Sequence, residues 1–190
     1  MAEIWKNDEY TLGGTASILT TPFGDAVHPL LDNPPTAWLH RQASFITGFW
    51  PEDMEVTVGE DIDYFYLPPI DEEQGRPVLG AGDVMSAMVD NESVRAVMQW
   101  LAEPESKRAW VEAGGFVSPN QTTPLDWYPT AADRGYAEIL NNATTFRFDA
   151  SDLMPGQVGA GSFWEGMVDW VQGTPTEQVL NRIDETWPEE

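Results

Sequence analysis

The second half of the chain carries hydrophobic residues at the spacing of amphipathic helices. In "NESVRAVMQWLAEP" (91–104) the apolar side chains recur at intervals of three and four, which places them on one helix face. They are Val94, Val97, Met98 and Leu101. Ser93 is the candidate cap, and Pro104 ends the segment because proline cannot continue a helix. The spacing predicts a helix over 91–104.

Four more segments of the second half predict helices, namely 105–115, 131–146, 162–173 and 174–188. The last has the strongest start signal. Thr174 is the candidate N-cap, Pro175 takes the first helical position, and Glu177 completes a capping box. The segment at 162–173 follows a stretch rich in Pro and Gly and begins on large aromatic residues. That stretch therefore predicts a loop that runs into an aromatic helix.

The first half shows short β-prone runs that end at Gly or Pro. These runs lie at 15–21, 42–50 and 64–70, and a further strand is predicted at 84–89 after a Gly-Ala-Gly-Asp turn. Strands and helices do not alternate tightly, and no repeat or low-complexity linker divides the chain. The pattern predicts a mixed α and β arrangement in one chain of 190 residues.

Composition and charge exclude several classes of binding partner. Hydrophobic residues make up 42% and aromatic residues 12%, which is globular despite a net charge of -23. Nine Lys and Arg against 32 Asp and Glu argue against nucleic acid and against an anionic membrane surface. The absence of Cys excludes disulfides and Cys-based metal sites. The start "MAEIWKNDEY" has no signal peptide, which predicts either a cytoplasmic protein or a missing natural N-terminus.

No catalytic or cofactor motif stands out. His28 and His40 do not match a zinc helix motif, and each is more readily a structural or surface residue. "LGAGD" lacks the third Gly of a dinucleotide site, and "GAGSFWEG" is not a nucleophile elbow. A glycosidase pair cannot be chosen among 32 carboxylates, although a glycoside hydrolase stays open as a minor alternative. The chain is predicted to be no enzyme and to hold no cofactor or metal.

Several blocks occur in a fixed order along the chain. They are "HRQASFITGFWPEDM", "YFYLPPI", "VLGAGDVMSAM", "EAGGFVSPN", "TFRFDASDLMPGQVGAGSFWEGMVDWV" and "EQVLNRIDETW". From about residue 3 to 188, this series resembles the C-terminal half of the extracellular solute-binding proteins of carbohydrate ABC transporters. The α-glucoside-binding type is the most similar subgroup, and maltose-binding protein is a more distant relative.

The resemblance implies an α/β fold of the periplasmic-binding-protein type (type II), here an incomplete lobe with C-terminal helices. Residues 1–75 would belong to the second lobe, 76–115 would cross to the first lobe and return, and 116–190 would complete the second lobe. The ligand would be an α-glucoside or another oligosaccharide held between closing lobes, and the permease subunits of the importer would be partners. The full-length parent would be extracellular or periplasmic and membrane-anchored.

The resemblance also implies that the N-terminal half is missing, so the chain would be truncated. Residues 91–115 would then lack the sheet that they normally cover. Their apolar face would be exposed or would pair with another copy. The alternative function is therefore a fragment that binds no sugar and self-associates through this surface.

Aromatic candidates follow from how proteins bind sugars, since a flat ring covers the C–H face of a pyranose while polar groups take the hydroxyls. The resemblance places Trp164 at a stacking position, and at least one of Phe49 and Trp50 in the cleft. Packing in the core, as expected for Phe163, Met167 and Trp170, is the alternative for Trp164. A ring that covers a strand end is the alternative for Phe49 and Trp50.

Polar candidates lie in two short stretches. Asp83 would accept hydrogen bonds from hydroxyls at the crossover between lobes, and Gly82 would let the backbone approach the ligand. In "RFDASD" the candidates are Arg147, Asp149 and Asp152. A turn cap is the alternative for Asp83, an ion pair for Arg147 and a loop cap for Asp152.

Overall fold

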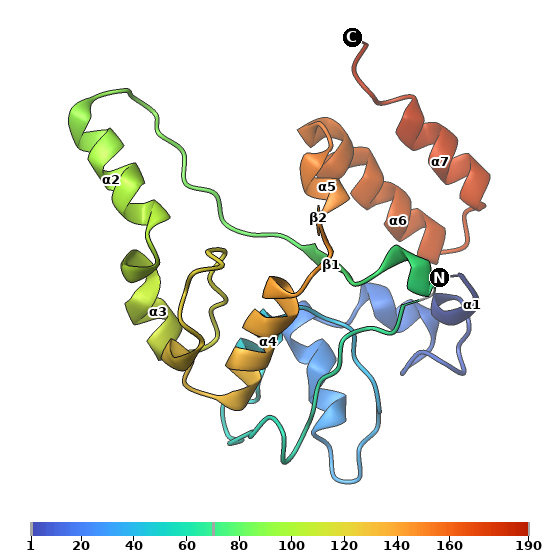
Figure 1. The fold of residues 1–190 in the computed structure, drawn as a ribbon. Helices are drawn as coiled ribbons and strands as arrows, with labels where there is room; N and C mark the ends of the chain where they lie inside the picture. The colour runs from blue at the N-terminus through green and yellow to red at the C-terminus, as the bar shows by residue number, and fades with distance from the viewer. Residues whose placement is uncertain (1, 70, 190) are drawn as a thin grey trace. The chain divides into compact units, whose positions relative to one another are not determined.

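The structure is a computed structural model, which describes residues 2–69 and 71–189 (Figure 1). The α-helices are α1 (Ala2–Trp5), α2 (Glu92–Ala102), α3 (Arg108–Ala113), α4 (Ala131–Asn141), α5 (Ala150–Leu153), α6 (Trp164–Val171) and α7 (Thr176–Asp184). The strands are β1 (Pro77–Gly80) and β2 (Thr145–Phe148). The predicted mixture of helices and strands is confirmed in this coarse form, with helices far in excess.

Shorter helical turns connect these elements. The 3₁₀ turns are η1 (Thr15–Leu19), η2 (Phe23–Leu30), η3 (Ser44–Phe49), η4 (Glu72–Gln74), η5 (Pro104–Lys107) and η6 (Leu125–Trp127), and η7 (Gln157–Phe163) is a π-helical turn. None of the helices in the described ranges is long and apolar enough to cross a membrane.

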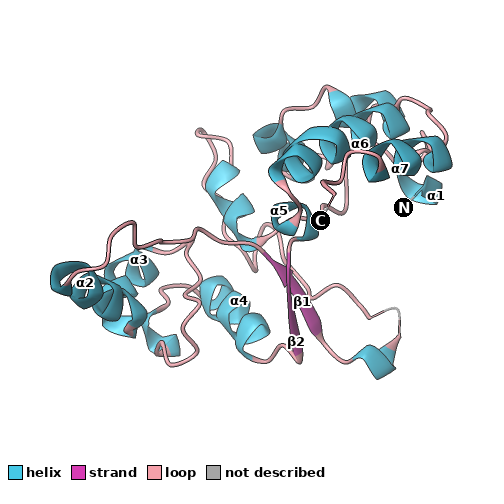
Figure 2. Cartoon of the chain, turned by 90° about the horizontal axis from the view of Figure 1, so that it is seen from above, coloured by secondary structure: helices cyan, strands magenta, loops and turns pink. Residues whose placement is uncertain are grey.

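The chain forms two compact units. The terminal unit contains the residues up to His40, 79–81, and those from Arg147 onward, and the central unit contains 41–78 and 82–146. The boundary falls inside both strands, which pair with each other as a two-stranded sheet (Figure 2). The assignment of residues 1–75 and 116–190 to one lobe of a receptor, and of 76–115 to the other, stays a prediction.

The core of the terminal unit is built from its C-terminal helices. Its buried residues are Val158, Trp170, Val171, Val179 and Ile183, and Trp5, Met154, Phe163 and Met167 pack against them. Gly166 lets α6 lie directly on α7, because a Cβ there would be 2.9 Å from Val179 Cγ1. The predicted core positions of Phe163, Met167 and Trp170 are confirmed.

The core of the central unit lies between α3, α4 and the loop that joins them. Val111, Tyr128 and Ala137 are buried, with Phe116, Val117 and Trp127 packed around them. The Tyr128 hydroxyl accepts a hydrogen bond from the Ser118 backbone N–H at 3.1 Å, which satisfies a buried donor. The central unit thus has its own hydrophobic core.

The predicted strands of the first half are wrong in the described residues. Residues 15–21 contain η1 and 42–50 contain η3, neither of which holds a buried residue. Residues 64–69 and 84–89 have no regular structure, while residue 70 lies outside the described residues. A strand needs a partner for its backbone hydrogen bonds, and in the described chain only β1 and β2 pair as named strands.

Helix ends also differ from the predictions. Asn91, not Ser93, caps α2, since its side-chain oxygen accepts from the Val94 N–H at 3.0 Å. Pro175 takes the cap position of α7 with no side-chain cap bond, so the capping box is absent there. The helix predicted over 131–146 ends at Asn141, because 145–148 pairs with β1.

Candidate functional site

Trp164 lies where the π turn η7 passes into α6, as that helix's first residue. Its ring is 68% exposed, whereas Trp170 on the same helix is only 8% exposed. Phe163 and Met167 are four residues apart and share the face that packs on the core. Trp164 lies seven residues before the buried Val171, on the same side of the helix, so its exposure comes from its position in the first turn and not from the helical period.

The turn before Trp164 is shaped by a close approach between two backbones. A Cβ at Gly159 would lie 2.1 Å from the Ser151 carbonyl oxygen, so only glycine lets η7 pack on α5 at this distance. Asp152 belongs to α5 and Trp164 directly follows η7. Gly159 therefore fixes the position of α5, which carries Asp152, against η7, which leads into Trp164.

Asp149 caps α5. Its Oδ1 accepts hydrogen bonds from the Ser151 backbone N–H at 2.9 Å and from the Ser151 hydroxyl at 2.8 Å. These bonds hold the pKa of Asp149 below its ordinary value, since they favour the charged form. Arg147 and Asp152 are exposed. The cap role considered for Asp152 is thus filled by Asp149, whose Oδ1 accepts both bonds of the turn.

Phe49 and Trp50 close η3 in the central unit. The Phe49 ring meets Phe45 edge-on, with 6.4 Å between centroids and 70° between planes. Trp50 is half-buried with extended backbone, φ -61° and ψ 148°. Phe49 therefore belongs to a small aromatic pair, and its contact with a sugar stays a prediction, as does that of Trp50.

Gly82 and Asp83 lie in the open segment between β1 and α2. Both are exposed, and a Cβ added at Gly82 would meet no atom within 4 Å. The predicted approach of a ligand to this backbone is sterically open. The side chain of Asp83 makes no hydrogen bond or ion pair with another described residue, so the turn-cap alternative finds no support there.

The eight candidates divide evenly between the two units. Arg147, Asp149, Asp152 and Trp164 belong to the terminal unit, and Phe49, Trp50, Gly82 and Asp83 to the central unit. The structure brings the first four onto neighbouring elements of one unit. No group of three or more His, Cys, Asp or Glu side chains that could hold a metal ion occurs in the described part of the chain.

A half-buried tyrosine pair was not predicted from the sequence. Tyr64 and Tyr136 lie with their ring centroids 4.4 Å apart, and the Tyr64 hydroxyl occupies the space above Gly135. Burial, with the neighbouring Tyr64 and acidic groups, raises the pKa of Tyr136 to about 12. Burial is the largest cause of this shift, and the ring contact places Tyr64 against α4. Gly135 inside a predicted helix was the available signal.

Two known proteins are similar to this chain along nearly all of its length. The osmoprotective compounds-binding protein GgtB of Synechocystis is 44% identical over 186 residues, which cover 98% of this chain. The alpha-glucosides-binding periplasmic protein AglE of Rhizobium meliloti is 42% identical over 184 residues, or 96% of this chain. Along nearly all of its own length, the chain is similar to solute-binding proteins of ABC sugar transporters. Both relatives are named as binding proteins, and neither as an enzyme.

The chain spans less than half the length of the two relatives that it matches. The chain spans 44% of the length of GgtB and 40% of that of AglE. No protein-family model and no solved structure matches the chain. The resemblance predicted from the ordered sequence blocks is thus confirmed over nearly all of this chain.

Proposed function

We propose that the chain contributes sugar-contacting residues to an ABC-importer solute receptor for an α-glucoside. AglE is named for α-glucosides and GgtB for osmoprotective compounds. An α-glucoside that also acts as an osmoprotectant, such as trehalose or sucrose, fits both names. The receptor would be a binding protein and not an enzyme, would work outside the cytoplasm, and would deliver its sugar to a permease.

The observation that supports the proposal is the exposed ring of Trp164, the first residue of a helix that packs on the core of the terminal unit. A pyranose presents a face of C–H groups, and a rigid indole covers such a face at low entropic cost. Trp170 and its neighbours hold α6, so the Trp164 ring is presented from a rigid element. Asp149 and Asp152 would accept hydrogen bonds from the hydroxyls, and Arg147 would donate one.

The remaining candidates complete the proposal. Phe49, Trp50, Gly82 and Asp83 would meet the sugar from the central unit. In a type II receptor, residues 1–75 and 116–190 would belong to one lobe and 76–115 to the other. The ligand would favour the closed arrangement of the lobes because only that arrangement lets both sets of residues reach it.

Isothermal calorimetry tests the proposal on the natural polypeptide that contains this sequence. The panel is trehalose, sucrose and maltose, with the β-linked cellobiose as the control. We expect saturable heat for at least one α-glucoside, with a dissociation constant on the order of micromolar, and at least about tenfold weaker binding of cellobiose. Absence of binding to every α-glucoside would contradict the proposal, and equal binding of cellobiose would contradict the α-specificity.

A further inference from the structure

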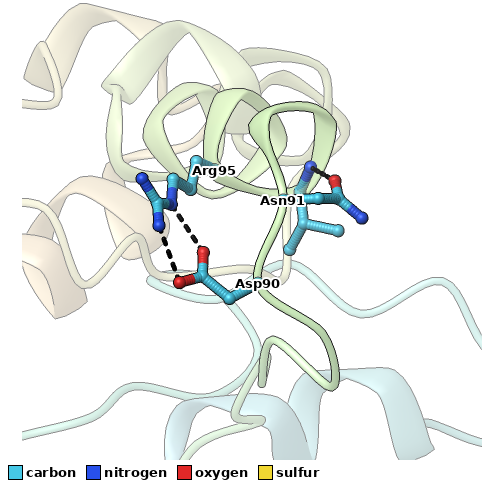
Figure 3. Close-up of polar contacts among 4 residues, drawn as sticks. Asp90, Asn91 and Arg95 are labelled. Carbon is cyan, nitrogen blue, oxygen red and sulfur yellow. Dashed lines mark hydrogen bonds and ion pairs between the residues drawn. The ribbon is translucent and has the colours of Figure 1, made fainter.

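The π turn η7 has little of its own to hold it in shape. It contains Gly159 and Gly161, and glycine gives the backbone more freedom than any other residue. Asn91 caps α2 with its own side chain (Figure 3), whereas no side chain of the described residues caps the start of η7. A π-helical repeat is rare and occurs mostly as a single turn inside an α-helix. Contacts from outside the turn therefore have to hold it.

Thr186, which follows α7 by two residues, supplies such contacts. Its backbone carbonyl accepts a hydrogen bond from Gln157 Nε2 at 2.7 Å, and its hydroxyl lies 2.6 Å from Ser162 Oγ. The same hydroxyl donates to the Ile183 carbonyl at 2.7 Å. Because a hydroxyl has one proton, Ser162 is the donor in its bond with Thr186. Thr186 thus binds the first residue of η7 and the last residue but one.

These two bonds fit a π turn better than an α-helix. Gln157 and Ser162 are five residues apart, which is the hydrogen-bond spacing of a π-helix. In an α-helix, residues five apart lie about 140° from each other around the axis, so their side chains point to different sides. Thr186 therefore favours the π repeat. Relaxing η7 to an α-helix would rotate α5 relative to Trp164 by one residue, about 100°.

Thr186 is itself held by the core of the terminal unit. Ile183, whose carbonyl accepts the Thr186 hydroxyl, is buried in this core. Gly166 lets α6 approach α7 there, since a Cβ at this position would lie 3.0 Å from Ile183 Cδ1. Val158 of η7 is buried in the same core. One core thus fixes α6 and α7, and the bonds of Thr186 extend this rigidity to η7.

We propose that Thr186 is a positioning residue for the sugar site. It holds η7 in the π repeat, and η7 determines how Asp152 on α5 is oriented relative to Trp164. This role rests on the proposed function, in which Trp164 covers the face of the sugar and Asp152 binds a hydroxyl. Thr186 acts through the turn and not by contact with the sugar. A turn that is already ordered binds the sugar more tightly, because ordering it on binding would cost affinity.

Thr186→Val tests this on the natural polypeptide that contains this sequence, because it removes the hydroxyl and keeps the shape of the side chain. We expect calorimetry to show about 5–10-fold weaker binding of the best-binding α-glucoside. Hydrogen exchange, measured by mass spectrometry without sugar, should be at least about tenfold faster at the backbone amides of 157–164. Thr186→Ser keeps the hydroxyl and should restore both values to within about twofold of the parent.

Thr176→Val is the matched control. The Thr176 hydroxyl accepts a hydrogen bond from Trp170 Nε1 at 2.9 Å, and Thr176 begins α7, at the opposite end from Thr186. The control therefore also replaces a threonine of this region and removes a hydrogen bond of its hydroxyl. It should change sugar affinity, and exchange at 157–164, by less than about twofold.

Circular dichroism should show every variant folded. Unchanged affinity or unchanged exchange in Thr186→Val would overturn the proposal. So would a Thr186→Ser variant as impaired as Thr186→Val, or an equal effect of Thr176→Val, because the hydroxyl at 186 would then have no special role. A parent protein that binds no α-glucoside would contradict the proposed function instead. Faster exchange in Thr186→Val would in that case still show that Thr186 holds the turn.

Discussion

Gly159 and Gly161 lie two residues apart in the same π turn and predict opposite results when each is replaced by alanine. A Cβ at position 159 would lie 2.1 Å from the Ser151 carbonyl oxygen and 3.3 Å from Met154 Cβ. At position 161 it would meet nothing within 4 Å. Neither glycine has a positive φ, so backbone strain does not separate the two substitutions.

The magnitudes follow from these contacts. Overpacking costs about 1–3 kcal/mol, and contact with a backbone atom that cannot move aside places Gly159→Ala at the upper end. Replacing a helical glycine by alanine stabilises the folded chain by about 0.5–1 kcal/mol in both variants. We expect Gly159→Ala to lower the free energy of unfolding by about 2 kcal/mol, and Gly161→Ala to leave it unchanged or raise it by up to about 1 kcal/mol.

Urea unfolding followed by far-UV circular dichroism and tryptophan fluorescence measures the pair. Comparing two variants of one turn cancels most effects on the unfolded chain, since both make the same chemical change. If Gly159→Ala were as stable as Gly161→Ala, the packing of α5 on η7 would be refuted. The placement of Asp152 relative to Trp164 would then lose its structural basis.

Three further predictions concern stability. Trp170→Ala should lower the free energy of unfolding by about 3–5 kcal/mol, because it leaves a cavity in the core and removes the Trp170 hydrogen bond to Thr176. The exposed Trp164 should change it by less than about 0.5 kcal/mol when replaced by alanine, and equal costs of the two variants in urea titrations would refute the assigned burial of Trp170 and exposure of Trp164. Burial lowers the pKa of His40, so as pH falls below about 6.5 the unfolded chain takes up a proton before the folded chain does, and stability falls. His40→Leu should reduce the drop in melting temperature between about pH 7.5 and 5.5, and a drop as large as in the parent chain would count against this reasoning. Because the pKa of Tyr136 is raised to about 12 in the folded chain, the unfolded chain loses this proton first and stability should fall as pH rises above about 10. Tyr136→Phe should lose less stability between about pH 9 and 11 in urea titrations, and an equal loss in both proteins would refute the reasoning.

Helices could be predicted from the sequence because their hydrogen bonds are local. The apolar spacing over 91–104 and the core face of 163, 167 and 170 both reappear in the structure. The caps were less predictable, since Asn91 and Ser93 are both good capping residues and only geometry chooses between them.

Strands could not be predicted in the same way. The runs at 42–50 and 84–89 have the composition of strands, but a strand forms only where another strand is available to pair with it. The first residues of β1 and β2, Pro77 and Thr145, are 68 residues apart in sequence, and local pattern does not reveal that the two strands meet. The close contact of Gly159 with Ser151 is likewise a tertiary fact that a glycine-rich sequence only suggests.

The candidate site was harder to predict than the helices. Periodicity alone does not give the exposure of Trp164, because this residue lies on the same helix face as the buried Val171. The capping role of Asp149 was not predictable either, because "RFDASD" offers two aspartates within reach of the same turn.

The central claim is that Trp164 stacks on an α-glucoside. Calorimetry of Trp164→Ala and Trp164→Phe with the best-binding sugar tests it most directly, on the natural polypeptide that contains this sequence. The account predicts affinity about 10–100-fold weaker for Trp164→Ala and a smaller loss for Trp164→Phe, which keeps a flat ring. Unchanged affinity in Trp164→Ala, with the protein folded, would contradict it.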